Sequence, residues 1–142
     1  VDEATPGTAT YEVVLDTEPT DDVTITVSGD PDVMASPGTL TFTAADWDTP
    51  QTVTVTAIDD LITEGAHTGT VTHTSASSDP LYVTPPLVID DVVVDVIDDD
   101  IPGITVSTTT VAATEGGADG TYDVVLDTQP TADVIVTLAT GT

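Results

Sequence analysis

Three groups of carboxylate side chains have the residue types and the spacing that suit metal binding. They are Asp59-Asp60 with Glu64, the run Asp98-Asp99-Asp100, and the pair Asp30 and Asp32. The first two groups come where an apolar, strand-like run ends, at Ile58 and at Ile97. In an antiparallel sandwich both groups could therefore meet at one end. Like charges that converge there would cost several kcal/mol unless a cation neutralised them.

Calcium is the cation that this chemistry favours. Ca²⁺ takes roughly 6–8 oxygen ligands at flexible geometry and prefers carboxylates, whereas Mg²⁺ retains water. The chain has no Lys or Arg against 26 acidic residues, a formal charge of -26, so no Lys or Arg ion pair can offset the repulsion. In an extended strand Asp98 and Asp100 share a face and Asp99 points away, so with the bend at Pro102-Gly103 Asp99 would serve a second ion or the following module.

The composition excludes several classes of function. Without a basic footprint the chain is a poor candidate for binding nucleic acid or acidic lipid. It has no Cys, and no apolar run approaches the roughly 18 residues of a membrane span, so we predict no disulfide and no membrane insertion. High charge with few aromatics also occurs in disordered chains, but here the apolar residues stand in alternating runs that favour strands.

Alternation with a period of two predicts β-strands along most of the chain. In residues 51–58 the Val and Ala side chains point one way and the Thr side chains the other. The same pattern, in places weaker, predicts strands at residues 11–15, 23–27, 38–43, 65–75 and 88–98. No segment has a helical period. The sequence therefore predicts an all-β fold, an antiparallel sandwich of about seven strands.

The chain repeats its own beginning. Residues 10–23 recur as residues 121–134, 111 positions later and without a gap, and 11 of the 14 positions are identical. We therefore predict a module in residues 1–100, nearly complete but with a truncated opening strand, a linker in 101–103, and the first part of a second module in 104–142. Because the chain opens inside this pattern, we expect it to be a section of a longer tandem array.

Several short motifs resemble the Calx-beta domain. They are Gly38-Thr-Leu-Thr-Phe42 after Asp32, the run Ile58-Asp59-Asp60-Leu61-Ile62-Thr63-Glu64-Gly65, the end Ile97-Asp98-Asp99-Asp100, and Thr114-Glu115-Gly116-Gly117 ahead of Tyr122. The resemblance covers residues 1–100 and, as a first portion, residues 104–142. It implies a seven-stranded immunoglobulin-like sandwich of the kind found in sodium–calcium exchangers and in large bacterial surface and adhesion proteins.

The resemblance also implies a Ca²⁺ cluster at one end of the sandwich. Its ligands in the first module would be Glu3, Asp32, Asp59, Asp60, Glu64, Asp98, Asp99 and Asp100, with the carbonyl of Ile62, and in the second module Glu115. This chain has Leu61 where the family's loop often has an acid, and it lacks another acid near His67. Glu3 matches the opening motif only with a one-residue gap. Fewer ions than in the exchanger domains are therefore expected.

The remaining reactive side chains give little support to an enzyme. His67 and His73 share a face of one expected strand, but they are six residues or roughly 20 Å apart, too far to share a metal, so we predict packed or edge histidines. No Cys or Lys nucleophile, nucleophile elbow or phosphate-binding glycine loop is present, and we predict no enzymatic activity. Trp47 and Tyr82 lie in expected loops, where they either anchor the loop or expose aromatic surface to a carbohydrate.

Together these features predict a structural module. Ca²⁺ at each junction would neutralise converging acids and stiffen an extracellular filament or adhesin stalk on a cell surface. Its partners would be neighbouring modules of the same or identical chains, and a host or surface glycan or protein. Two alternatives are a calcium-sensing regulatory domain and a carbohydrate-binding module of a secreted protein. A further possibility is that residues 104–142 complete a neighbouring chain's sandwich by strand exchange.

Overall fold

The chain forms two compact units. The computed structural model describes residues 1–4, 7–83 and 87–139. The first unit comprises Val1–Asp60 and Gly65–Asp99, and the second comprises Leu61–Glu64 and Asp100–Thr142. One division between the units thus falls between Asp99 and Asp100, and the short segment Leu61–Glu64 groups with the second unit. None of the described residues lies in a helix that is long and apolar enough to cross a membrane.

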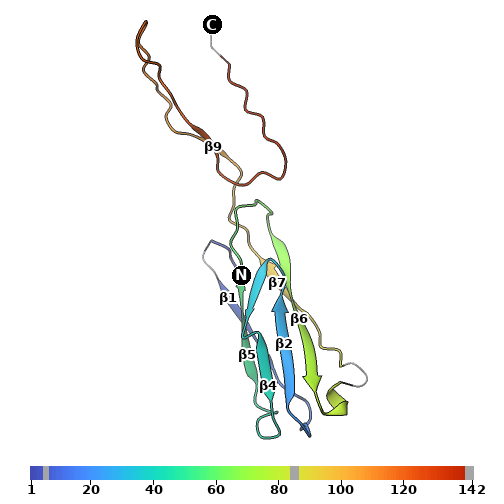
Figure 1. The fold of residues 1–142 in the computed structure, drawn as a ribbon. Helices are drawn as coiled ribbons and strands as arrows, with labels where there is room; N and C mark the ends of the chain where they lie inside the picture. Colours follow the sequence, from blue (N-terminus) through green and yellow to red (C-terminus); the bar gives the residue numbers. More distant parts are fainter. Residues whose placement is uncertain (5–6, 84–86, 140–142) are drawn as a thin grey trace. The chain divides into compact units, whose positions relative to one another are not determined.

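The first unit is an antiparallel β-sandwich (Figure 1). One sheet has the strand order β1-β5-β3 and the other the order β4-β2-β6-β7, with every neighbouring pair antiparallel. The strands are β1 (Thr8–Val13), β2 (Val23–Gly29), β3 (Val33–Ser36), β4 (Thr39–Phe42), β5 (Gln51–Ala57), β6 (His67–Ser77) and β7 (Val92–Val96). The predicted all-β fold and sandwich are thus confirmed, with seven strands in this unit.

The core is built from the alternating apolar positions of these strands. On β2 the side chains of Val23, Ile25 and Val27 are buried, and on β5 those of Val53 and Val55 are buried. The Thr residues between them lie on the opposite, more exposed face, as a period of two requires. The remaining buried apolar residues are Leu15, Val33, Leu40, Phe42, Ala57, Val71, Tyr82, Val94 and Val96. The hydrophobic effect of burying this set stabilises the contact between the sheets.

Strand β3 has no counterpart among the strands that the sequence predicts. It is only four residues long, and Val33 is its one fully buried side chain. It pairs with the end of β5, where Val33 lies opposite Ala57. So short a segment carries too little alternation to be recognised without its partner strand.

The two loop aromatics belong to the packing of the sandwich. Trp47 is half-buried against the core, and its carbonyl accepts a hydrogen bond from the Leu15 N–H at 3.1 Å. Tyr82, at the end of the 3-10 turn η1 (Pro80–Tyr82), is 6% exposed, and its hydroxyl donates to the carbonyl of Thr17. The irregular segment that the sequence indicates at residues 75–86 includes this turn, while residues 84–86 lie outside the described residues.

The second unit does not repeat the structure of the first. It contains β8 (Ile104–Val106) and β9 (Val124–Leu126), which pair antiparallel with Ile104 opposite Leu126. Gln129 N–H donates to the Leu61 carbonyl at 2.7 Å, which ties the segment Leu61–Glu64 to this unit. Residues 127–139 contain no strand, although their counterparts one repeat earlier include β2. The tandem repeat therefore stays a prediction from the sequence, and residues 140–142 of the expected second module lie outside the described range.

Candidate metal site

The first residues of the chain lie beside the end of β7 in a parallel arrangement. Asp2 forms a parallel bridge with Ile97. The Ile97 N–H donates to the Val1 carbonyl at 3.0 Å, and the Glu3 N–H donates to the Ile97 carbonyl at 3.1 Å. This short ladder fixes the register between two segments at opposite ends of the unit's sequence. It places Glu3 next to Asp98, the first acid after β7.

Glu3 is a buried carboxylate with a second carboxylate beside it. Its side chain is 3% exposed, and one of its oxygens lies within 4.8 Å of a carboxylate oxygen of Asp98. Asp98 is half-buried, and its Oδ2 accepts a hydrogen bond of 2.6 Å from the Gly65 N–H. Gly65 has a φ of 71°, a conformation that glycine adopts at little cost. The turn at Gly65 thus aims its N–H at Asp98, just before β6 begins.

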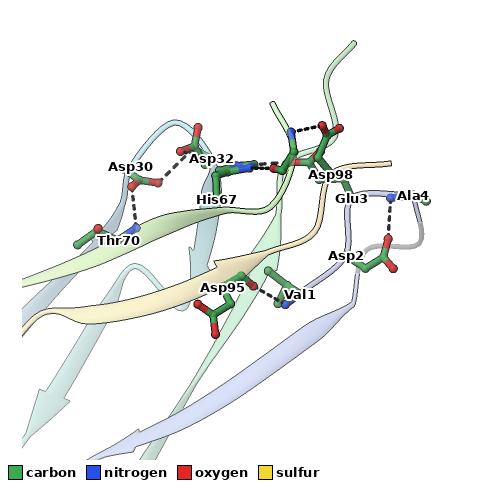
Figure 2. Close-up of polar contacts among 11 residues, drawn as sticks. Val1, Asp2, Glu3, Ala4, Asp30, Asp32, His67, Thr70, Asp95 and Asp98 are labelled. Carbon is green, nitrogen blue, oxygen red and sulfur yellow. Dashed lines mark hydrogen bonds and ion pairs between the residues drawn. The ribbon is translucent and has the colours of Figure 1, made fainter. Parts of the chain in front are cut away.

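His67, the first residue of β6, adds an imidazole to this pair of acids. It lies opposite Val96 of β7, so β6–β7 pairing brings it to the same end of the sandwich. Its Nδ1 is 2.9 Å from the Gly65 carbonyl oxygen, and its Nε2 is 3.7 Å from Glu3 Oε1 and 4.0 Å from Asp32 Oδ2. Figure 2 shows His67 between Asp32 on one side and Glu3 and Asp98 on the other.

Asp32 reaches the cluster from the turn between β2 and β3, and Asp30 fixes that turn. The two carboxylate oxygens of Asp30 accept hydrogen bonds from the Thr70 N–H at 2.6 Å and the Asp32 N–H at 3.1 Å (Figure 2). The Asp32 carbonyl accepts from the Ile58 N–H at 3.0 Å. Asp30 therefore positions the backbone of Asp32, and the turn is joined both to β6 and to the end of β5.

The structure brings together only part of the predicted ligand set within the first unit. Glu3 lies beside Asp98, and Glu3 and Asp32 each lie near His67. Asp59, Asp60 and Asp99 belong to the same unit and are exposed. Glu64, Asp100, Ile62 and Glu115 belong to the second unit, where Glu64 and Glu115 are exposed.

Comparison of the chain with protein-family models, curated proteins and solved structures gives no match. The chemistry of the site is therefore inferred from its own residues and distances.

The sequence does not indicate the surroundings of His67 or the role of Asp30. It predicts a packed or edge histidine at position 67, whereas the end of β6 brings His67 near Glu3 and Asp32. It groups Asp30 with Asp32, and in the structure the Asp30 carboxylate accepts hydrogen bonds from backbone N–H groups. The Asp-x-Asp spacing of a turn is the sequence signal for this second role.

The second buried carboxylate of the described structure shows how an acid can be accommodated without a cation. Asp79 is 1% exposed, and its oxygens accept hydrogen bonds from the Thr20 N–H at 2.8 Å and the Leu81 N–H at 2.9 Å. These backbone donors, Thr20 first and then Leu81, hold the pKa of Asp79 below its ordinary value. Glu3 differs from Asp79 because a second carboxylate, that of Asp98, lies beside it.

The spacing of Glu3 and Asp98 would allow both carboxylates to bind one metal ion, because a carboxylate oxygen of each lies within 4.8 Å of the other. This holds for any cation that carboxylates bind, Ca²⁺ among them. Burial in a medium of low dielectric strengthens the repulsion between such acids, and a divalent cation would convert that repulsion into attraction.

Proposed function

We propose that the first unit is a calcium-stabilised structural module of an extracellular, repetitive surface protein. Ca²⁺ would bind at the end of the sandwich that carries Glu3 and Asp98. The observation that carries this proposal is the proximity of the buried Glu3 carboxylate to Asp98 in a chain with no Lys or Arg. The ion would then join the opening segment to the end of β7, so its binding would resist separation of the unit's two ends.

A structural role is favoured over regulation and over glycan binding by two features. The sequence repeat at residues 121–134 supports an array of modules rather than a single sensor. Trp47 and Tyr82, the aromatics that a carbohydrate-binding module would need, pack against the core. The Calx-beta resemblance is compatible with either a surface filament or a sensor, so the affinity for calcium is the distinguishing quantity.

Thermal unfolding of the full chain with Ca²⁺ and with chelator tests the proposal. A ligand that binds only the folded state must raise its stability, so Tm should increase with the Ca²⁺ concentration. At a formal charge of -26 any cation gives some screening, so the chelator sample needs the same ionic strength and a parallel series needs Mg²⁺. A half-effect at about 10⁻⁴–10⁻³ M would support a structural site, and one at micromolar concentration would support a sensor.

Two Asp→Asn variants locate the calcium effect. Asp98→Asn should abolish most of the Ca²⁺-dependent rise in Tm, because it removes a charged ligand from the cluster. Asp48→Asn removes the same charge from an exposed position between β4 and β5 and should leave the rise intact. Equal responses of both variants, or a Tm that chelation leaves unchanged in the wild type, would refute a calcium site at this end of the sandwich.

A further inference from the structure

One edge of the sandwich is open to a further strand. β1 stands at the end of the sheet β1-β5-β3, and no strand of the described residues pairs with its outer side. Just past β1 the Leu15 N–H donates to the Trp47 carbonyl, in the loop that leads into β5. The burial of residues 11–16 alternates, as in an extended chain. Consecutive residues of such a chain direct their backbone groups to opposite sides, so those of Val14 face the open edge.

The second unit contains the same short sequence with a strand paired to it. Residues 13–15 and residues 124–126 are both Val-Val-Leu. In the second unit this tripeptide forms β9, and β8 pairs with it antiparallel, with Thr105 opposite Val125. The chain therefore shows which of its own segments such an edge accepts.

The residues of β9 that bond to β8 correspond to the residues that face the open edge of β1. The Asp127 N–H donates to a carbonyl beside β8 at 3.0 Å, and the Asp123 carbonyl accepts from an N–H on the same side at 2.9 Å. Residues 123, 125 and 127 thus direct their backbone groups toward β8. One repeat earlier these positions are residues 12, 14 and 16, which alternate with Leu15 and so face away from β5.

An apolar groove lies beside the open edge. It has a volume of about 370 Å³, and its lining includes Leu15, Ile25 and Ile89. In the pair of β8 and β9, Ile104 lies opposite Leu126, the counterpart of Leu15. A strand that paired with β1 in the same register would place Ile104 beside Leu15, and so at the groove.

Burial favours β1 over β9 as the partner of this segment. In the second unit Ile104 is 50% exposed and Val106 is 44% exposed, and a two-stranded sheet alone is only marginally stable. Exchange of β9 for β1 would retain the backbone hydrogen bonds and add apolar contacts in the groove. Residues 101–114 have no charged side chain, so the segment adds little to the repulsion between two acidic chains.

We propose that the open edge of β1 accepts the β8 segment of a second copy of this chain as an antiparallel strand. Thr105 of one copy lies opposite Val14 of the other, in the register that β8 has with β9. Each copy has one acceptor edge and one donor segment, so the pairing can join more than two copies. The pairing goes beyond the proposed function and does not require calcium. The flanking pairs are Ile104 with Leu15 and Val106 with Val13.

Disulfide trapping between two single-cysteine variants tests the pairing and its register. The chain has no Cys of its own. Directly opposed residues that share hydrogen bonds have Cα atoms about 5.5 Å apart, a distance that a disulfide spans. Val14→Cys mixed with Thr105→Cys under mild oxidation should give several times more mixed dimer, identified by its intact mass, than Met34→Cys mixed with Thr105→Cys. Met34 is the matched control because it is exposed on β3, at the opposite edge of the same sheet.

A peptide that spans residues 101–113 supplies a measurement without any substitution, for the case in which a cysteine disturbs the fold. In ¹H–¹⁵N spectra of the full chain, an excess of this peptide should shift the amide signals of Glu12, Val14 and Asp16 more than that of Met34. A peptide of the same composition in scrambled order should leave these signals in place.

Two results would overturn the proposal. One is an equal yield of mixed dimer from the two mixtures of folded variants, and the other is an amide signal of Val14 that the peptide does not shift. Both experiments are carried out in chelator, so their failure would leave the calcium function to be judged by Tm alone. A Tm that Ca²⁺ does not change would, in turn, leave the strand pairing standing.

Discussion

The hydroxyl of Tyr11 lies 2.7 Å from Nε2 of His73, and this hydrogen bond joins the two sheets of the first unit. Tyr11 belongs to β1 and His73 to β6, and their rings meet edge to face with centroids 5.6 Å apart. Since the Asp90 carbonyl accepts from Nδ1, the Nε2 atom is the acceptor and the tyrosine is the donor. The pair therefore acts as a polar link between two sheets whose facing residues are mainly apolar.

Removal of this link should lower stability without changing the fold. Tyr11→Phe retains the ring and deletes the donor, so we expect a loss of about 1 kcal/mol in the free energy of unfolding, the usual value for a neutral hydrogen bond. Urea denaturation with an unchanged m-value would measure it. An unfolding free energy equal to that of the wild type would mean that water replaces the hydroxyl at no cost.

Alkaline pH should weaken the same link. Burial raises the pKa of Tyr11 above its ordinary value of 10.0, so the folded state favours the protonated hydroxyl. The contribution of Tyr11 is therefore fully present below pH 10.0 and is lost as the pH rises through the raised pKa. Unfolding free energies of the wild type and Tyr11→Phe should converge above that pH. If the difference in unfolding free energy between the two proteins stayed constant at alkaline pH, the protonated Tyr11 hydroxyl would not be its source.

Asp79 should make the first unit less stable as the pH falls, whereas the contribution of Tyr11 is lost as the pH rises. The N–H groups of Thr20 and Leu81 hold its pKa below 3.8, so its contribution is present above pH 3.8 and is lost as the pH falls toward the lowered pKa. Asp79→Asn should reduce Tm by several degrees at neutral pH. The difference from the wild type should close in acid. Asp48→Asn, at an exposed position, is the control and should show no such closing difference.

Two glycines provide a steric test of the sandwich. A Cβ on Gly29 would lie 2.0 Å from the Val33 carbonyl oxygen, a backbone atom that cannot move without disturbing β3. Gly29→Ala should therefore cost roughly 1–3 kcal/mol. A Cβ on Gly38 would meet only the Val27 carbonyl oxygen at 3.8 Å, so Gly38→Ala should change stability by less than about 0.5 kcal/mol. Similar unfolding free energies for both variants would contradict the close approach of Gly29 to the Val33 carbonyl.

The effect of Glu3→Gln on Tm should change sign when calcium is added. In chelator the substitution removes one of several neighbouring negative charges, so Tm should rise by several degrees. With saturating Ca²⁺ it removes a ligand, so the variant should become less stable than the wild type. Glu12→Gln on the exposed face of β1 should show neither change. If the same one of the two proteins, wild type or Glu3→Gln, had the higher Tm both in chelator and in saturating Ca²⁺, this would argue against an ion at Glu3.

Local alternation made most of the sandwich predictable. The pattern of Val53, Val55 and Ala57 on β5 depends on residues two positions apart, and it was confirmed by their burial. The position of Glu3 could not be found in this way, because it depends on a parallel bridge between Asp2 and Ile97, which are far apart in sequence. Its place in the ligand set came instead from a motif resemblance that required a gap.

The second unit shows the limit of the same reasoning. Val134 and Val136 are more than 40% exposed, whereas their counterparts one repeat earlier, Val23 and Ile25, are buried on β2. In the first unit β2 is held between two partner strands, β4 and β6. Strand propensity is expressed only against such partners, so identical residues need not form the same strand.

The parallel ladder at Val1, Glu3 and Ile97 has a consequence for a unit under tension. Pulling at Val1 and at the residues after Asp98 would draw these two neighbouring segments in opposite directions along their common axis. The hydrogen bonds of Ile97 to the Val1 carbonyl and of Glu3 to the Ile97 carbonyl would then be loaded together in shear, because both lie across the direction of pull. Glu3 and Asp98 lie at one end of this ladder, so a metal ion bound to both would add a further bond that must break before the segments slide apart.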